Sequence, residues 1–262
     1  MARPAAYALL LLLATLWGSS YLFIRVAVEE IPPLTLIAAR VAIAAAFLLA
    51  VMAARRERLP RGRAVWGRLY VQAVLNSIGA WTVLAWGQQH IGAGLASVLN
   101  STAPLFVFFI SLAGACLGVA GVALIVGAEA LEGLGRSDAL ALTGQGAALL
   151  GALMYAGAAI YGRRFGDIGP VAAAAGTMIW ATTTLVPAAL IVDRPWRLSP
   201  SAEALAAAGA LGLFCTGVAL ILYFRLIEAL GSMGVASQAY LRAGIGVALG
   251  AVVLGEEVAP TA

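Results

Sequence analysis

The sequence contains no lysine, a single histidine and two cysteines, and only 11% of its residues are charged. A soluble domain carries about 25% charged residues on its surface, so a water-soluble globular protein is excluded. The two cysteines, Cys116 and Cys215, both lie in apolar runs, and no cluster of metal-ligating residues accompanies them. Neither a disulfide framework nor a metal site is predicted, and no cofactor is expected.

Apolar residues are abundant instead: 63% of the 262 residues are hydrophobic, and the mean hydropathy is +0.98. Lipid must therefore be the solvent of this chain, which is predicted to be all-α, a polytopic bundle of transmembrane helices. The net charge of +4 rests on arginines that cluster between the apolar runs. That arrangement is typical of cytoplasmic membrane loops and argues against a nucleic-acid partner.

About nine apolar runs approach the length of a membrane span, which is roughly 20 residues. The first is predicted to be a retained helix rather than a cleaved signal peptide, because it lacks a short core with a clean cleavage site and many spans follow it. The runs are Ala6–Val28, Pro33–Ala53, Arg68–His90, Gly94–Leu112, Ala113–Gly127, Ala141–Gly162, Gly169–Val192, Ala204–Arg225 and Val235–Leu254.

The uncharged stretch Ser97–Gly127 has 31 residues, which is too long for one crossing and too short for two ordinary helices and a turn. The segment Arg55–Arg68 carries six arginines and one glutamate, so it is predicted to be cytoplasmic, with the N-terminus on the same side. Two crossings of Ser97–Gly127 then place Arg163 and Arg164 in the cytoplasm as well, whereas one crossing places them outside. Arginine placement therefore favours two shortened crossings.

The two parts of the chain resemble each other at an offset of 137 to 140 residues. LLLATLWGSSYLFIR (11–25) aligns with LLGALMYAGAAIYGR (149–163), and GLAS (94–97) aligns with GVAS (234–237). Because the repeat unit holds an odd number of spans, the second copy must be inverted, and such repeats place a binding site near the membrane midplane. The predicted units are 1–128, with helices 1–5 of which 4 and 5 are shortened, and 140–262, with helices 6–9.

Four stretches carry a family resemblance: LWGSSYLFIRVAVEEIPPLTLIAARVAIAAAFLL, ASVLNSTAPLF, YFRLIEALGSMGVAS and LGEEV. In this order, and over most of the chain, they resemble the EamA-type members of the drug/metabolite transporter superfamily. The resemblance implies ten spans in two inverted five-helix halves, cytoplasmic termini, and transport of small metabolites, often amino acids and related compounds. Against that pattern, the loop between helices 4 and 5 is missing and the last of the ten helices is lacking.

Arginines inside a span cost about 2.5–3.5 kcal/mol each, so Arg25, Arg40 and Arg242 need partners or a function. Arg25 precedes Glu29 by four residues, which predicts a local ion pair. Arg40 has no acid near it in the sequence, and two interpretations stay open: its side chain reaches the outer interface, or it contacts a substrate carboxylate or backbone carbonyls. Arg242 either faces a water-filled cavity or marks a damaged copy.

Polar and aromatic residues at mid-depth complete the candidates for a substrate site. In lipid such polar groups need partners, so hydrogen bonding between helices is the alternative role for each of them, and packing is the alternative for each aromatic ring. Trp17 and Tyr155 are equivalent in the two halves and are candidate aromatic walls. The predicted substrate-binding set is Trp17, Ser20, Arg40, Asn76, Trp81, Ser97, Asn100, Ser101, Tyr155, Ser237 and Tyr240.

The predicted function is transport of small metabolites, amino acids or related compounds, by alternating access between two inverted repeats. The alternative is a degenerate or accessory membrane protein without transport activity. No enzyme is predicted, because the sequence shows no His-Glu-x-x-His run, no paired membrane aspartates, and no serine or cysteine near a membrane histidine. The expected partners are a small-molecule substrate and the lipid bilayer, and a homodimer or a pairing with a complete paralogue stays open. Abundant alanine and arginine without lysine predict the bacterial plasma (inner) membrane.

Overall fold

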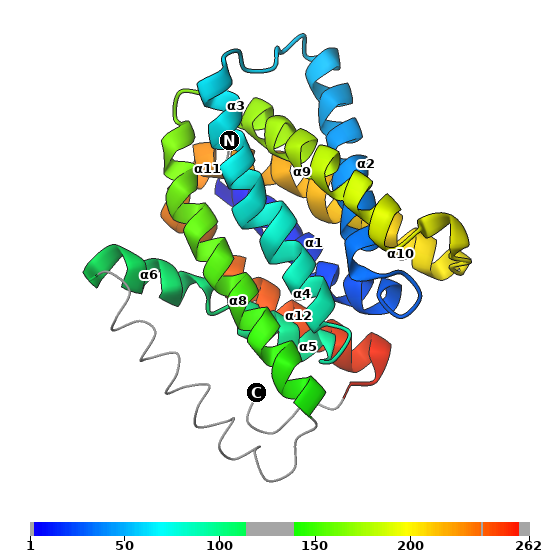
Figure 1. Ribbon diagram of the computed structural model, residues 1–262. Coiled ribbons are helices and arrows are strands. Elements are labelled where there is room, and N and C mark those ends of the chain that lie inside the picture. The colour runs from blue at the N-terminus through cyan, green and yellow to red at the C-terminus, as the bar shows by residue number, and fades with distance from the viewer. Residues whose placement is uncertain (1–2, 114–138, 237, 257–262) are drawn as a thin grey trace.

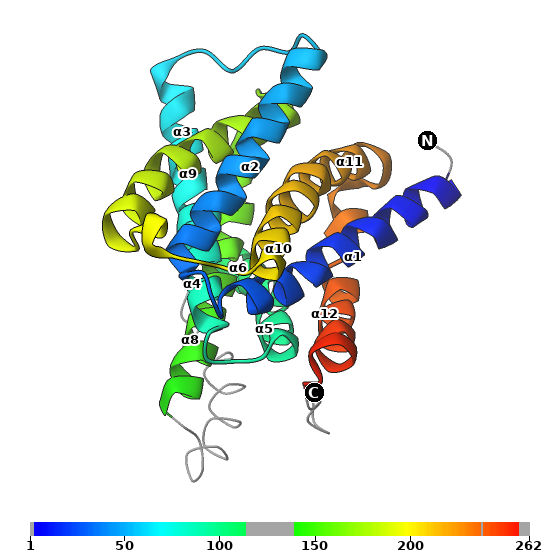
Figure 2. The same cartoon turned by 90° about the vertical axis from the view of Figure 1, so that its right-hand side faces the viewer.

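The computed structural model describes residues 3–113, 139–236 and 238–256, and these residues form helices joined by short loops (Figures 1 and 2). Six helices are long and apolar enough to cross a membrane, and each coincides with a run predicted from the sequence. A helix satisfies all its main-chain hydrogen bonds internally, which is why continuous apolar sequence takes this form in lipid. The six are Pro4–Ala27, Pro33–Ala54, Arg63–Gly87, Ala139–Gly162, Pro170–Val192 and Ala202–Tyr223.

Two of these spans contain a π-helical segment, η1 in the third and η4 in the last. Such segments are wider than an α-helix, are uncommon, and often occur at functional sites. The elements are α1 (Arg3–Ala27), α2 (Pro33–Ala54), α3 (Arg63–Ala73), η1 (Val74–Ala80), α4 (Trp81–Gly87), α5 (Ala93–Asn100), α6 (Ala103–Ala113), α8 (Ala139–Gly162), η2 (Arg163–Phe165), α9 (Pro170–Val192), η3 (Pro195–Arg197), α10 (Ala202–Gly212), η4 (Leu213–Val218), α11 (Ala219–Ala236) and α12 (Gln238–Leu254).

The fourth predicted span is broken in its middle. α5 ends and α6 begins on either side of Ser101 and Thr102, because Pro104 has no N–H with which to continue the helix. The two hydroxyls donate to main-chain carbonyls three residues earlier, at 2.6 and 2.7 Å. They thereby satisfy acceptors next to the break, which is where the structure places the predicted site residue Ser101.

The main core lies where α2 packs against α9, with α10 beside them (Figure 2). Alanines are frequent among its buried side chains, for example Ala38 and Ala45 on α2 and Ala175 on α9. Small residues let helix backbones approach closely, which maximises van der Waals contact where lipid removes the hydrophobic driving force. Gly212 on α10 shows how close the approach is, since a Cβ at this position would lie 2.8 Å from the Cβ of Ile43.

The contacts between helices follow the internal repeat. A contact between two elements has a counterpart in which each element is replaced by its equivalent from the other part of the chain, before residue 128 or after residue 139. α1 packs on α12 as α8 packs on α5, and α2 packs on α10 as α9 packs on α3. Likewise, α1 contacts α10, η4 and α11, while α8 contacts η1 and α4. The π segments also correspond, because η4 begins 139 residues after η1.

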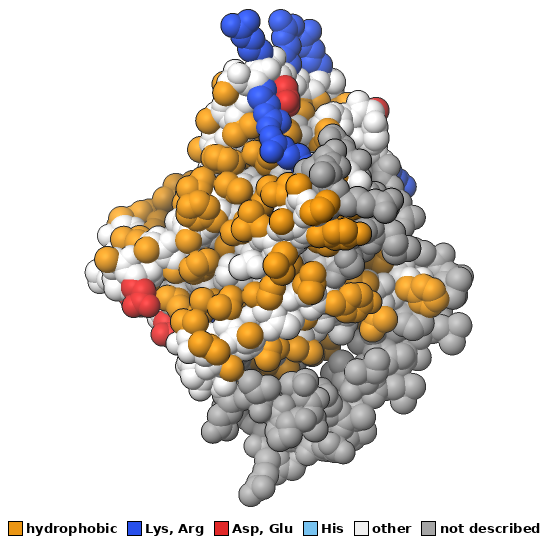
Figure 3. Space-filling view, turned by 180° about the vertical axis from the view of Figure 1, so that it is seen from behind, with side chains coloured by type: hydrophobic (Ala, Val, Ile, Leu, Met, Phe, Trp, Pro, Cys, Tyr) orange, Lys and Arg blue, Asp and Glu red, His pale blue; other side chains and the backbone are white. Residues whose placement is uncertain are grey.

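Two arginine-bearing segments meet at one end of the bundle, which we call the arginine end: residues 55–68 and 163–169. Arg68 joins them, pairing with Asp167 at 2.7 Å and donating from Nη1 to the main-chain oxygen of Arg164 at 2.7 Å. Figure 3 shows arginine side chains gathered at this end, above faces coloured mainly by hydrophobic side chains.

A second pair of spans meets at the end of the bundle opposite the arginines. α4 ends at the opposite end of the bundle, where α8 begins, and Gly87 and Gly144 are in close contact there (Figure 1). The end of α4 and the start of α8 therefore lie at the same end of the bundle. The predicted span Ala113–Gly127 lies almost entirely outside the described residues.

One helix end departs from the prediction. The sequence predicts an end of the eighth span at Arg225 and a start of the ninth at Val235, but α11 continues to Ala236 and α12 begins at Gln238. The residues between these two positions include leucine, glutamate and alanine, which are strong helix formers. Their polarity suggests a loop, but they continue the helix.

Candidate functional site

Arg40 is a buried cation within a membrane span, with only 4% of its surface exposed. Its Nε donates a hydrogen bond to the hydroxyl of Thr216 at 2.9 Å, and its guanidinium carbon lies 3.8 Å from the centroid of the Trp81 ring. A guanidinium over an indole face is a cation–π contact, which strengthens when both groups are desolvated. The interpretation in which Arg40 extends to the membrane interface is therefore wrong.

Three elements bring these groups together. Arg40 is the eighth residue of α2, Trp81 begins α4 directly after η1, and Thr216 lies inside η4. In η4 the Thr216 hydroxyl donates to the carbonyl of Leu211, five residues earlier, at 2.9 Å, while its oxygen accepts from Arg40. The hydroxyl uses both its donor and its acceptor capacity, so the π-helical main chain orients it toward the guanidinium.

Further helices add two tyrosines near Arg40, and through these tyrosines an amide and a second arginine. Tyr155 on α8 lies within electrostatic range of Arg40, Tyr21 and Arg242. The hydroxyl of Tyr21 on α1 accepts a hydrogen bond from Nδ2 of Asn100 on α5, at 2.7 Å. We define the Arg40 cluster as Tyr21, Arg40, Trp81, Asn100, Tyr155, Thr216 and Arg242.

In the part of the chain that the structure describes, no carboxylate balances the charge of this cluster. The three ion pairs found there lie toward the two ends of the bundle. Nη1 and Nη2 of Arg40 make no hydrogen bond to the described residues, and Nε of Arg242 and Oδ1 of Asn100 are buried with no partner among them. Buried polar groups normally have partners, so this concentration makes the Arg40 cluster the candidate ligand site.

Two predicted residues of α1 serve its own packing instead. Trp17 packs on Tyr223 of α11, with ring centroids 5.4 Å apart, while its equivalent Tyr155 lies beside Arg40. Ser20 is buried, and its hydroxyl donates to the carbonyl of Trp17 at 2.6 Å. The two rings predicted as equivalent aromatic walls therefore face different neighbours in this structure.

The remaining predicted residues divide between helix packing and the surface. Ser97 is fully buried and donates toward two main-chain carbonyls of α12 at 3.3 and 3.4 Å, so it joins α5 to α12. Asn76 donates to its neighbour Ser77 at 3.4 Å within η1. Tyr240 is 70% exposed and lies outside the cluster. Ser237 lies outside the described residues.

Tyr21 and Thr216 were not predicted as site residues. Tyr21 stands one helical turn after Trp17, so the sequence pattern selects the correct helix but the wrong depth along it. Thr216 is the residue directly after the equivalent of Asn76 in η4. An alignment of the two π-helical segments is the comparison that points to Thr216.

The family description that matches this chain is the EamA-like transporter family, over residues 4–127 and 142–262. The chain belongs to that family. The resemblance found in the sequence is thereby confirmed, and the chain is a membrane transporter by family. The two matched segments together supply the Arg40 cluster, the first with Arg40 and Trp81 and the second with Tyr155 and Thr216.

Relatives of this EamA-family transporter have been named without an assigned substrate. The uncharacterized inner membrane transporter YedA of Escherichia coli K12 is 28% identical over 252 residues, which cover 92% of this chain and 80% of YedA. The uncharacterized transporter YoaV of Bacillus subtilis is 27% identical over 160 residues, covering 56% of this chain and 53% of YoaV. A solved crystal structure superimposes with a TM-score of 0.67 at 20% identity, covering 99% of this chain and 92% of its own, which shows a shared fold.

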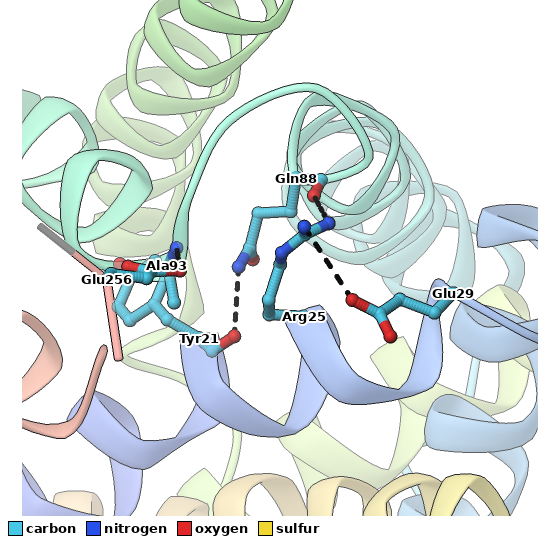
Figure 4. A network of polar contacts seen from close by, with 6 residues as sticks. All are labelled: Tyr21, Arg25, Glu29, Gln88, Ala93 and Glu256. Carbon is cyan, nitrogen blue, oxygen red and sulfur yellow. Dashed lines mark hydrogen bonds and ion pairs between the residues drawn. The ribbon is translucent and has the colours of Figure 1, made fainter. Parts of the chain in front are cut away.

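At the end opposite the arginines, polar contacts tie α1 of the transporter to α4 (Figure 4). Arg25 pairs with Glu29 at 3.6 Å, which confirms the predicted ion pair, and its Nη1 donates to the main-chain oxygen of Gln88 at 3.1 Å. The fully buried Gln88 in turn donates from Nε2 to the main-chain oxygen of Tyr21 at 2.9 Å. The backbone at Tyr21, and hence its hydroxyl in the cluster, is positioned by this network.

Two more carboxylates hold helix starts at the same end. Glu256, after α12, accepts from the main-chain N–H groups of Ala93 and Gly94 at 2.7 and 2.9 Å, two donors of the first turn of α5 that have no partner within the helix (Figure 4). Glu30 accepts from both the main-chain nitrogen and the hydroxyl of Ser201 at 2.6 Å, and these hydrogen bonds hold the pKa of Glu30 below its usual value. Glu30 is therefore a charged partner of a helix N-terminus at neutral pH.

A pocket of about 350 Å³ lies near this end between α2, α4 and α9. Its walls are largely apolar, and no residue of the Arg40 cluster reaches it. With 4% of its surface exposed, Arg40 is enclosed by the described residues. The lining residues are Pro33, Leu34, Thr82, Val83, Trp86, Val192 and Asp193.

Proposed function

We propose that this transporter moves small metabolites that bear a carboxylate, amino acids or closely related compounds, and that Arg40 binds the carboxylate. The observation that carries the proposal is a buried guanidinium with two nitrogens free of described protein partners and no acid beside it. Arginine presents a planar fork of N–H donors that matches a carboxylate with two parallel hydrogen bonds. A substrate carboxylate would also supply the counter-charge that the cluster lacks.

The aromatic members of the cluster support a substrate with an apolar part. Trp81 lies against one face of the guanidinium and so restricts the plane in which its free N–H groups point. Tyr155 and Tyr21 add ring surface and hydroxyls next to Arg40. Sites of this kind combine mostly apolar walls with a few polar groups that fix orientation.

We further propose alternating access between two inverted repeats, residues 1–128 and 140–262. The exchange of helix partners between the two parts supports this division, as does a cluster with members from both. Surface contacts hold each end: Arg68 with Asp167 at the arginine end, and Glu30 with Ser201 at the other. Opening to one side then requires release of one set of contacts while the other remains.

The proposed location is the bacterial inner membrane, with the arginine end and the N-terminus in the cytoplasm. The excess of arginine at that end supports the orientation, since cytoplasmic loops retain positive charge. The description of YedA as an inner membrane transporter supports the membrane assignment.

The test is counterflow in proteoliposomes preloaded with unlabelled amino acids. Each active amino acid is compared with its amide and with its decarboxylated amine, because these analogues keep the side chain and lose the negative charge. We expect exchange of the acid and at least tenfold slower exchange of both analogues, from loss of charge-assisted hydrogen bonds of about 1.5–3 kcal/mol each. Equal exchange of acid and amide contradicts the role of Arg40, and no exchange of any compound under any gradient favours the non-transporting alternative.

A further inference from the structure

A second basic site lies at the arginine end, apart from the Arg40 cluster. A pocket of about 260 Å³ forms where the loop between α2 and α3 meets the loop that leads into α9. It is lined by Arg58, Pro60, Arg61, Val65, Asp167, Ile168, Gly169 and Ala172.

The pocket carries positive charge that the described protein does not neutralise. Asp167 is the one acid in its lining, and both of its carboxylate oxygens accept from Arg68, at 3.3 and 2.7 Å. These bonds hold the pKa of Asp167 below its usual range, so it is charged and engaged with Arg68 at neutral pH. Arg58 and Arg61 are exposed and make no ion pair or side-chain hydrogen bond to any residue that the structure describes.

The walls of the pocket are held in place by contacts with α3. Nε1 of Trp66 donates to the main-chain oxygen of Pro60 at 3.0 Å, which fixes the loop that carries the two arginines. Nη1 of Arg68 donates to the main-chain oxygen of Arg164 at 2.7 Å, which fixes the other loop. A site preformed in this way needs little ordering when it binds a ligand.

Aromatic residues of the kind found at a membrane–water interface lie on the helices that line the pocket. Trp180 on α9 packs edge-on against Trp66 and Tyr70 of α3, with ring centroids 6.3 and 5.1 Å apart, and its Nε1 donates to the main-chain oxygen of Trp66 at 2.9 Å. Tyr70 is exposed on the bundle surface. Tryptophan and tyrosine concentrate at the membrane–water interface, and here they lie next to the arginine-bearing loop.

We propose that this pocket binds the phosphate group of an anionic phospholipid, held by Arg58 and Arg61. Guanidinium groups match phosphate oxygens with paired N–H donors, and basic pockets between membrane helices select anionic headgroups. Val65, Ile168 and Ala172 form an apolar part of the lining, suited to the first methylene groups of the acyl chains. The pocket holds a headgroup, while the acyl chains lie along the apolar outer faces of α3 and α9.

The test uses the full-length protein in a neutral detergent and native mass spectrometry with phosphatidylglycerol. The double variant Arg58→Gln/Arg61→Gln is compared with Arg56→Gln/Arg63→Gln, which removes the same charge from exposed arginines outside the pocket. We expect the pocket variant to bind phosphatidylglycerol about 10- to 100-fold more weakly than wild type, and the matched control to differ by less than about threefold. Arg58→Lys/Arg61→Lys keeps the charge but lacks the paired N–H donors, so its affinity is expected to lie between those of the wild type and the glutamine variant.

Competition experiments identify the source of the phosphate. Phosphatidylcholine and soluble glycerol 3-phosphate, tested as competitors at the same concentration, should not displace phosphatidylglycerol from the wild-type protein. Displacement by glycerol 3-phosphate overturns the lipid assignment in favour of a soluble phosphate compound. An equal loss of binding in the pocket and control variants overturns the site itself, because it shows diffuse attraction to the whole arginine end.

Discussion

Replacing Arg40 by glutamine should abolish transport and leave the fold nearly as stable as before. Removing an arginine from a membrane span recovers about 2.5–3.5 kcal/mol of insertion cost. Against this stand the lost charge-assisted hydrogen bond to Thr216, about 1.5–3 kcal/mol, and the lost contact with the Trp81 ring, about 0.5–2 kcal/mol. The midpoints of these ranges cancel to within about 1 kcal/mol, so the melting temperature should move by only a few degrees.

The effect on transport is expected to be much larger. Two parallel guanidinium–carboxylate hydrogen bonds are lost together in Arg40→Gln, which corresponds to at least about a 100-fold fall in kcat/KM for uptake. Arg40→Lys keeps the charge but cannot present the planar fork, so it should lose about tenfold. Thr216 is not left without a partner in either variant, because its hydroxyl also donates to the carbonyl of Leu211.

The measurement pairs thermal unfolding of the purified variants with counterflow in proteoliposomes, normalised to folded protein. A residue that binds substrate separates the two readouts, whereas a purely structural residue moves them together. If Arg40→Gln lowers the melting temperature by more than about 10 °C and transports at the wild-type rate per folded molecule, the assignment of Arg40 to the substrate site is refuted.

Other contacts of the bundle give three more expected outcomes. Thr216→Val removes the acceptor of the buried guanidinium and should raise KM about tenfold, whereas Thr177→Val, whose hydroxyl bonds only its own helix, should leave KM unchanged. Gly246→Ala places a methyl group against the buried serine of α5 and should lower the free energy of unfolding by about 1–3 kcal/mol. Gly146→Ala lies on an open surface and should not lower it. Equal melting temperatures of the two variants contradict this packing. Hydrogen bonds from the Arg68 guanidinium hold the pKa of Asp167 below the ordinary 3.8. The ion pair of these two residues is therefore present at neutral pH and is lost as the pH falls through the lowered pKa. Amide protection factors at the start of α3 should fall on acidification in the wild type and be lower and pH-independent in Asp167→Asn, and the same acid response in both contradicts the pairing.

The spans were predictable from the sequence because their signal is local. A run such as Pro33–Ala53 is apolar without interruption and is flanked by polar residues, and α2 coincides with it to within one residue. The ion pair between Arg25 and Glu29 was equally accessible, since residues four apart share a helix face. The continuation of α11 beyond Arg225 was not predictable in this way, because the helix-forming residues there have a polarity that is also typical of a loop.

The site was predicted only in part because its members are chosen by contacts between helices. Ser97 and Asn100 both looked like mid-membrane polar residues, yet only Asn100 faces the cluster, while Ser97 joins α5 to α12. Thr216 contacts Arg40 across 176 residues of sequence, through a π segment that no local pattern announced. Tyr240 turned outward, since one rotation of a helix decides whether a side chain meets protein or lipid.

The sequence by itself determined that this chain belongs in a membrane, where its helices cross, and which family it joins, because hydropathy, arginine clusters and motif order are properties of the chain read in one dimension. Only the tertiary structure decided that Arg40 is buried against Trp81 and Thr216 rather than extended to the interface, and that the two arginine-bearing segments share one end of the bundle. Both depend on which helix faces meet, and in lipid that choice is made by close packing of small residues and by the pairing of buried polar groups.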